Sequence, residues 1–152
     1  SPINPIFALV IIYLVSMRVR LLVDLANVLS RQRLSETSLS VYRLALRLYP
    51  DAVSRALALI NYGAALLRSG QVDAATELLE RALVEGGGSL PPKYEASCRY
   101  NLGVAYRRQG QRQQAIREFN RVMDLLPRST YAIQAQKALE RAAAKADERR
   151  EN

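Results

Sequence analysis

Side chains suited to covalent or metal chemistry are scarce in this sequence. Histidine is absent, which removes the commonest general base and the commonest metal ligand. Cys98 is the single cysteine, so the chain can form neither an internal disulfide nor a cluster of thiolate ligands. Because Cys98 falls inside a predicted helix, we interpret it as a small buried hydrophobe.

Two further patterns also fail to indicate a catalytic centre. The glycine run at residues 86–88 lacks the Lys–Ser/Thr pair that a phosphate-binding loop needs. Glu77 and Glu80 are spaced as a solvated helix face would place them. We therefore expect no catalytic residue, no cofactor and no metal, and we predict that the protein is not an enzyme.

Arginine carries most of the charge. Lysine and arginine number 22 against 14 acidic residues, which gives a net charge of +8. Residues 96–129 hold seven arginines against two acidic residues, a local net charge of 7 − 2 = +5; the arginines are Arg99, Arg107, Arg108, Arg112, Arg117, Arg121 and Arg128. Arginine suits bidentate contact with carboxylates and phosphates.

This charge predicts an acidic protein partner or anionic lipid headgroups, with a solvated basic face as the alternative. Nucleic acid is disfavoured, because no array of aromatic and basic residues for base stacking is present and no base-reading motif occurs.

The elements that position these arginines are predicted to be helices. Apolar residues in 96–129 recur at helical spacing, Gly110 interrupts the first helix, and Pro127 ends the second. Small Gly103 and Ala115 would let two antiparallel helices approach closely, with Tyr106 and Phe119 filling the space beside them. No run alternates with the period of a strand.

Residues 96–129 resemble the tetratricopeptide repeat, a helix–turn–helix unit of 34 residues. The matching landmarks are Leu102, Gly103, Tyr106, Ala115, Phe119 and Pro127. Two positions depart from the pattern, since Arg99 replaces a tryptophan and Val122 replaces a small alanine.

Two weaker copies precede this unit. A shift of 40 residues places Leu59, Tyr62, Gly63, Leu66, Gly70, Ala75, Leu79 and Ala82 in the same slots of residues 56–89. A further shift places Leu22, Leu25, Ala26, Leu29, Ser38, Tyr42, Ala45 and Pro50 in those of residues 19–52, a degenerate copy with no glycine in its turn at residues 31–34.

The resemblance implies an all-α fold, a right-handed superhelical solenoid of antiparallel helix pairs. We expect three repeats over residues 19–129 and a capping helix over residues 130–152, begun by Ser129 or Thr130. A narrow apolar stripe predicts how that helix packs: Ala132, Ala135, Leu139, Ala142 and Ala146.

Residues 1–18 are predicted to be a hydrophobic anchor. Residues 6–17 carry no charge, and their helical rise of about 18 Å falls short of the ~30 Å bilayer core. The segment can instead be the lower part of a longer span, and snorkelling arginines extend its buried length. The anchor residues are Ile6, Phe7, Leu9, Val10, Ile11, Ile12, Tyr13 and Leu14.

Both faces of the anchor are apolar, so a single neighbouring helix cannot bury it. We expect membrane contact or burial in a partner complex; packing on the first repeat is the alternative. A signal peptide is disfavoured, because the basic residues follow the apolar run.

The apolar stripe continues into the first repeat, which predicts one long helix without a linker. Arg18, Arg20, Arg31 and Arg33 would place the repeats on the cytoplasmic side.

In this family the first helices of the repeats line a concave groove that binds peptides or partner helices. By position, the groove residues of this chain are Leu57, Ile60, Asn61, Ala64, Arg68, Ser97, Tyr100, Asn101, Val104, Arg107 and Arg108. The slots that carry cations in chaperone-binding relatives hold Val23, Ser97 and Asn101, which disfavours a carboxylate clamp. An amphipathic segment with acidic residues is the expected ligand.

The leading hypothesis is a membrane-anchored scaffold that helps assemble, stabilise or recruit a membrane protein complex. One alternative is a soluble cytoplasmic subunit whose apolar N-terminus is buried in a partner. Because the chain begins at Ser1 and not at methionine, a regulatory tail of a larger membrane enzyme is a third hypothesis.

Overall fold

The computed structural model describes residues 4–32, 35–48 and 51–151, although not the side chains of Ser35 and residues 145–151. Arg33, Leu34 and Pro50, which entered the predictions above, and the side chain of Ala146 lie outside this part. The helices are α1 (Pro5–Arg31), α2 (Ser35–Arg47), α3 (Ala52–Arg68), α4 (Val72–Gly86), η1 (Gly87–Ser89), α5 (Pro92–Arg108), α6 (Arg112–Leu125) and α7 (Thr130–Glu151).

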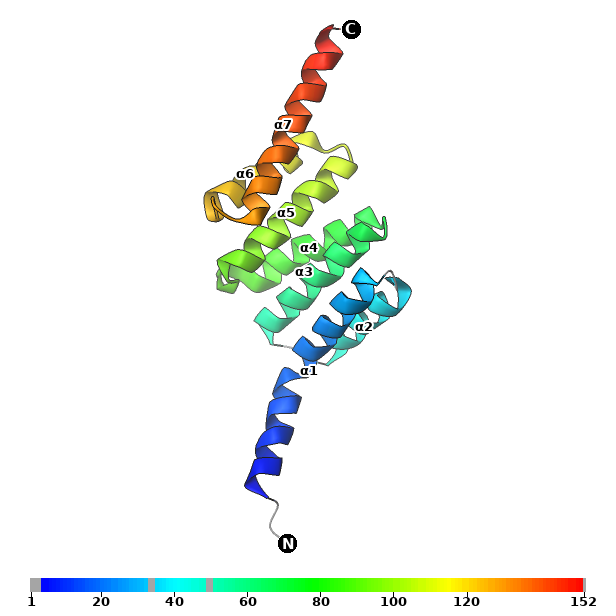
Figure 1. Ribbon diagram of the computed structural model, residues 1–152, viewed down its shortest axis with the longest axis vertical. Coiled ribbons are helices and arrows are strands. Elements are labelled where there is room, and N and C mark those ends of the chain that lie inside the picture. Colours follow the sequence, from blue (N-terminus) through cyan, green and yellow to red (C-terminus); the bar gives the residue numbers. More distant parts are fainter. Residues whose placement is uncertain (1–3, 33–34, 49–50, 152) are drawn as a thin grey trace.

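The helices form three pairs in chain order, α1 with α2, α3 with α4, and α5 with α6 (Figure 1). The first helices also contact one another in the order α1, α3, α5, α7, and each second helix contacts the first helix that follows it. Two layers result, one of first helices and one of second helices. The predicted all-α class is confirmed, whereas the right-handed superhelical winding stays a prediction.

The helix boundaries follow the expected signals. Gly110 has a φ of 77° and Gly70 a φ of 85°, the left-handed conformation in which glycine ends a helix without strain. The α6 helix ends at Leu125, two residues before Pro127. The Ser129 hydroxyl accepts a hydrogen bond from the Ala132 amide at 3.0 Å, so Ser129 begins α7 as predicted.

Glycine permits the close approach within the second and third pairs. A Cβ atom at Gly103 would lie 2.6 Å from the ring of Phe119, and one at Gly63 would lie 2.7 Å from Leu79 Cγ. Phe119 and Leu79 are almost fully buried. These glycines therefore allow a large side chain of the second helix to pack directly against the backbone of the first.

Cys98 is fully buried in α5, as expected of a small hydrophobe. Its thiol donates a hydrogen bond to the carbonyl oxygen of Leu79 at 3.3 Å, which ties α5 to α4. Burial raises the pKa of the Cys98 thiol to about 12.

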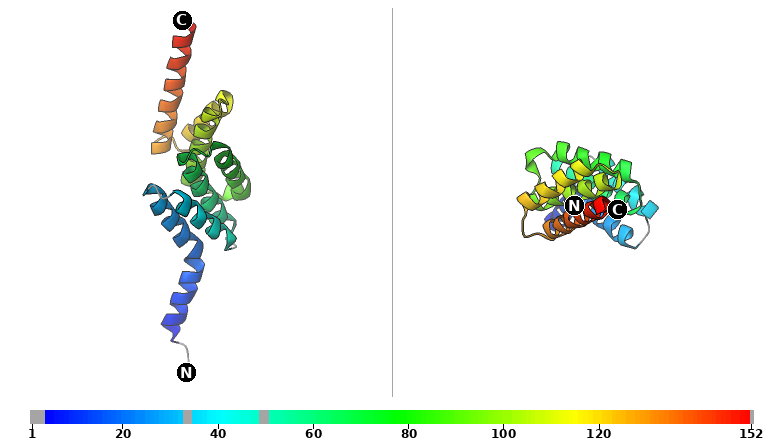
Figure 2. Two further views of the ribbon diagram at one scale, coloured as in Figure 1. Left: turned by 90° about the vertical axis from the view of Figure 1, so that its right-hand side faces the viewer. Right: turned by 90° about the horizontal axis from the view of Figure 1, so that it is seen from above.

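Helix α1 is continuous from the predicted anchor into the first pair, as the apolar stripe indicated. Its N-terminal half projects from one end of the molecule, while the C-terminal half of α7 projects from the other (Figures 1 and 2). The eight anchor side chains are 44–69% exposed. The alternative in which the anchor packs on the first repeat is therefore wrong, because these side chains are exposed and the buried residues of α1 begin at Val19.

The first pair departs from the repeat pattern at one landmark. Leu25 occupies the slot of the buried Leu102, yet it is 48% exposed. Leu21 and Val28, on the same side of α1, are also exposed. An uncovered apolar strip thus continues from the anchor along the outer face of the first helix.

We predict that Gly103→Val lowers the free energy of unfolding by about 1–3 kcal/mol, because the added methyl groups displace the Phe119 ring. Asn120→Val, on the exposed face of α6, is the control and should change it by less than about 0.5 kcal/mol. Chemical denaturation followed by circular dichroism measures both. Equal effects of the two substitutions would show that α5 and α6 do not meet at Gly103.

A second prediction concerns alkaline pH. Burial raises the pKa values of Cys98 and Tyr42, ordinarily 9.0 and 10.0, to about 12 each. The folded state therefore retains protons that the unfolded chain releases, so stability is full below pH 9 and falls as the pH rises towards 12. Cys98→Ser keeps a donor and does not titrate in this range. Its denaturation midpoint should fall less between pH 8 and about pH 10.5 than that of the unaltered chain, and an equal fall would refute the role of the thiol.

Candidate partner-binding groove

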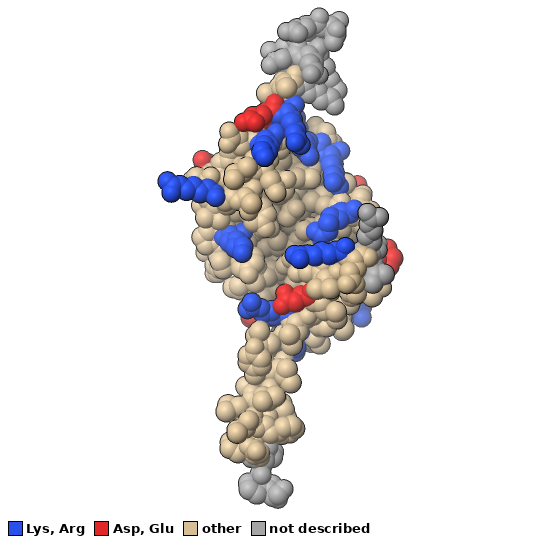
Figure 3. All heavy atoms as spheres, viewed as in Figure 1, with Lys and Arg blue, Asp and Glu red and all other residues tan. Residues whose placement is uncertain are grey.

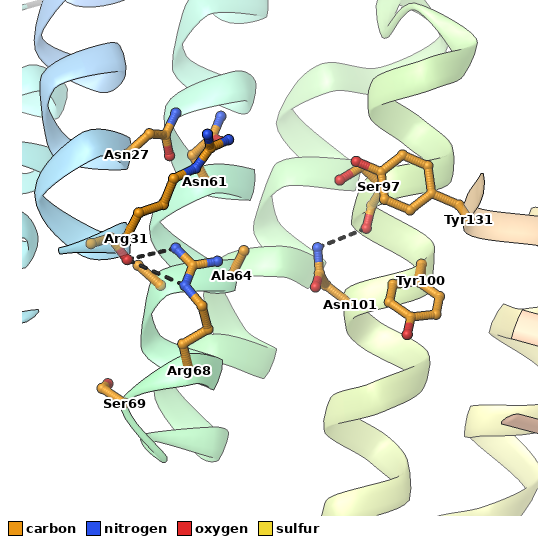
Figure 4. A pocket seen from close by; sticks show the side chains of 12 residues that line it. Asn27, Arg31, Asn61, Ala64, Arg68, Ser69, Ser97, Tyr100, Asn101 and Tyr131 are labelled. Carbon is orange, nitrogen blue, oxygen red and sulfur yellow. Dashed lines mark hydrogen bonds between the residues drawn. The ribbon is translucent and has the colours of Figure 1, made fainter. Parts of the chain in front are cut away.

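A cavity of about 830 Å³ lies across the layer of first helices. Its lining comes from α1, α3, α5 and α7: Asn27, Ser30, Arg31, Asn61, Ala64, Ala65, Arg68, Ser69, Ser97, Tyr100, Asn101 and Tyr131. Figure 4 shows the side chains of α1 and α3 on one side and those of α5 and α7 on the other. We call this surface the concave groove.

The concave groove is polar and cationic. Arg31 and Arg68 enter it from the ends of α1 and α3, and no acidic side chain occurs among its described lining residues. On the face shown in Figure 3, basic side chains surround a hollow formed by uncharged residues. An acidic ligand is therefore favoured over a basic one.

The two asparagines predicted to contact a partner are both engaged within their own helices. The side-chain nitrogen of Asn61 donates to the carbonyl oxygen of Leu57 at 2.9 Å, and that of Asn101 donates to Ser97 at the same distance. Each amide oxygen remains as an acceptor towards the groove. To bind a partner backbone through both the oxygen and the nitrogen of the amide, each of these side chains would have to rotate.

Aromatic side chains form the end of the groove nearest α7. The Tyr100 ring lies 6.0 Å from the Tyr131 ring and 5.9 Å from that of Phe119, measured between centroids. Their contact joins α5, α6 and α7. This end of the groove is therefore held by packing between helices, and its shape does not depend on a ligand.

Six of the eleven predicted groove residues line this cavity together: Asn61, Ala64, Arg68, Ser97, Tyr100 and Asn101. The other five lie elsewhere. Leu57 borders a smaller cavity beside α1, Ile60 is buried with 3% exposed, and Val104 is half-buried in the core. Arg107 lines a separate cavity between α6 and α7, and Arg108 donates to the carbonyl oxygen of Leu67 at 2.6 Å.

Sequence reasoning missed the other six lining residues, although the repeat register contained a signal for Arg31. They are Asn27, Ser30, Arg31, Ala65, Ser69 and Tyr131. Arg31, Arg68 and Arg108 are the last residues of α1, α3 and α5 and are 37 and 40 residues apart, the shifts that relate the repeats. The guanidinium of Arg68 donates two hydrogen bonds to the Ser30 hydroxyl, at 2.7 and 3.2 Å. The guanidinium of Arg108 donates to the carbonyl oxygen of Leu67. Each of these two arginines thereby links its helix to the end of the preceding first helix.

Arg99, counted above as part of the basic surface, is neutralised inside the third pair. Its guanidinium contacts Glu95 at 2.8 Å and Glu118 at 2.9 Å, and its side chain is only 15% exposed. Desolvation lowers the pKa of Arg99, but the two carboxylates more than offset it, so the net shift is upward. An ion pair between α5 and α6 thus occupies the place of the family's tryptophan.

The family model described as Tetratricopeptide repeat matches residues 96–129. Those residues form α5, α6 and the turn that joins them, with Gly103 at the contact of the two helices. This segment matches the family both in sequence and in the arrangement of its two helices. The helix pairs α1–α2 and α3–α4 are consistent with further tetratricopeptide-like units, and no curated protein matches the chain.

A tetratricopeptide repeat indicates a role in protein–protein interaction, since repeats of this family are typically non-enzymatic interaction modules. Across the residues that the structure describes, no cluster of three or more cysteine, aspartate or glutamate side chains is arranged to hold a metal ion.

Proposed function

We propose that this chain is a non-enzymatic, membrane-anchored tetratricopeptide scaffold. It binds an acidic segment of a protein partner in the concave groove and helps assemble, stabilise or recruit a membrane protein complex. The observation that carries the proposal is the apolar half of α1, which is exposed on every side and continuous with the repeats.

The size of α1 supports insertion into a bilayer. The helix has 27 residues, and its most apolar stretch of 18 has a mean hydropathy of 2.3 with only 11% of its residues buried. The uncharged stretch of residues 5–17 rises about 20 Å at 1.5 Å per residue, so the anchor approaches the ~30 Å hydrocarbon core only when the arginine side chains that follow it snorkel. Apolar side chains exposed all round a helix are stable only in lipid or within a partner.

Arg18 ties the anchor to the repeats where the apolar segment ends. Its guanidinium donates to the carbonyl oxygens of Val15 at 2.6 Å and of Leu48 at 3.0 Å. The second contact joins α1 to the end of α2 and so supports a fixed direction for the anchor. Because Arg18, Arg20 and Arg31 all follow the apolar segment, we place the repeats on the cytoplasmic side.

The concave groove suits an extended acidic segment. Arg31 and Arg68 can pair with carboxylates, and the amide oxygens of Asn61 and Asn101 can accept hydrogen bonds from the N–H groups of an extended peptide. The lining combines these polar groups with Ala64, Ala65 and the rings of Tyr100 and Tyr131. Because its charged groups are arginines, we expect the affinity for an acidic ligand to fall with added salt.

One alternative has a specific observation in its favour. Leu21, Leu25 and Val28 are exposed on the part of α1 beyond Arg20, where the helix would already have left the membrane. This strip suits a structural subunit whose α1 packs along a partner protein. Under that alternative the N-terminal half of α1 is buried in protein, and anionic lipid is not required.

We predict that the full chain floats with protein-free vesicles in a density gradient, because the anchor partitions into the bilayer. Leu9→Asp with Ile12→Asp should abolish flotation, since each charge costs about 2.5 kcal/mol or more at the centre of a helix in a membrane. The matched control is Leu9→Ala with Ile12→Ala, which should still float. Failure of the unaltered chain to float would favour the subunit alternative.

For the concave groove we predict that Arg31→Glu with Arg68→Glu weakens binding of an extended, glutamate-rich peptide by about tenfold or more, because two attractive charges become repulsive. The control is Arg43→Glu with Arg121→Glu, which makes the same change of charge on α2 and α6. Isothermal titration calorimetry of detergent-solubilised chains measures the affinities. Equal weakening by both pairs would assign the binding to net charge and not to the groove.

A further inference from the structure

A second cavity, of about 550 Å³, lies between α6 and α7, away from the concave groove. Apolar residues from these two helices form most of its lining: Ala115, Ile116, Phe119, Ala138, Leu139 and Ala142. Gly110 and three arginines, Arg107, Arg112 and Arg141, complete it. We call this surface the α6–α7 groove. It shares no lining residue with the concave groove.

The helix contacts show how this surface is built. In each earlier pair, a second helix packs on its own first helix and on the first helix that follows. Helix α7 occupies the place of a first helix and contacts α5 and α6. The side chains of Ile116, Leu139 and Ala142 are only partly covered in the described part of the chain. Partly covered apolar side chains on two adjacent helices form a surface on which a further helix can pack.

The charges at the α6–α7 groove indicate which kind of helix would bind there. Arg107, Arg112 and Arg141 are exposed, and none of the ion pairs among described side chains involves them. The described lining contains no acidic residue to balance them. A ligand that places carboxylates at the edges and apolar side chains in the middle would satisfy both parts of the groove. A second copy of this chain is disfavoured, because each copy carries a net charge of +8.

The two grooves thus favour different ligands. The concave groove presents arginines and asparagines and suits an extended acidic segment, whereas the described lining of the α6–α7 groove is mostly apolar with arginines at its border. We propose that the α6–α7 groove is a second docking site, which binds an acidic amphipathic helix of a partner protein. This inference does not depend on the membrane anchor or on a ligand in the concave groove.

The probe is a synthetic helix of about 18 residues, five turns, with leucine along one face and glutamate elsewhere. Two control peptides accompany it: one has lysine in place of glutamate, and the other has the same composition in a scrambled order that is not amphipathic. Binding to the full chain in lipid nanodiscs is measured by fluorescence anisotropy, with empty nanodiscs as the blank.

The glutamate helix should bind, and both control peptides should bind at least about tenfold more weakly. Arg112→Glu with Arg141→Glu should weaken the glutamate helix by about tenfold or more, while Arg31→Glu with Arg68→Glu should leave its affinity unchanged. Ile116→Ala with Leu139→Ala should weaken it too, with helicity retained by circular dichroism as the check on folding.

Three results would overturn the proposal: no binding of the glutamate helix, equal binding of the scrambled peptide, or equal effects of the two arginine pairs. The first would show that the groove accepts no such helix, and the others that charge alone attracts the probe. Flotation and binding of the extended peptide are separate measurements. If the glutamate helix does not bind at the α6–α7 groove, the proposed scaffold function is unaffected. If flotation or binding of the extended peptide fails, the proposed docking site is likewise unaffected.

Discussion

The structure depends on how closely the two helices of each pair approach. At Gly103 and Gly63 the first helix has no side chain, and Phe119 or Leu79 of the second helix packs against its backbone. This contact fixes the distance between the layer of first helices and the layer of second helices. The lining of the concave groove comes from the layer of first helices. Its width therefore depends on how these helices pack against the layer of second helices.

The same packing leaves two parts of the chain uncovered. A repeat buries its apolar surface against its neighbours, and an end that lacks a neighbour keeps part of that surface exposed. At one end the outer side of α1 stays open and continues into the apolar N-terminal half of the helix. At the other end the α6–α7 groove stays open in the described part of the chain. We propose a membrane for the first surface and an acidic helix for the second, on the basis of the charges that accompany each.

The fold could be predicted because short-range rules determine it. Glycines at the turns, proline after α6 and the apolar spacing of the third repeat all led to the correct helices. The residues of the concave groove were harder to predict, because a position in the repeat pattern does not show which neighbouring side chains cover it. Ile60 is buried and Arg107 faces another cavity, although both occupy groove slots of the family. The charge of Arg99 is neutralised by Glu95, which lies outside the 34-residue unit, and by Glu118 in the next helix. A count of charged residues cannot show these pairings, because it treats each charge as independent of the others.

We propose that this chain serves a membrane protein complex through an anchor and a partner groove. The most direct measurement is to solubilise the source membranes in mild detergent, capture the chain, and determine the mass and composition of what is recovered with it. We expect stoichiometric recovery with a large membrane complex, in which the N-terminal half of α1 is in contact with lipid or with that complex. Recovery of the chain alone, or from the soluble fraction, would contradict it.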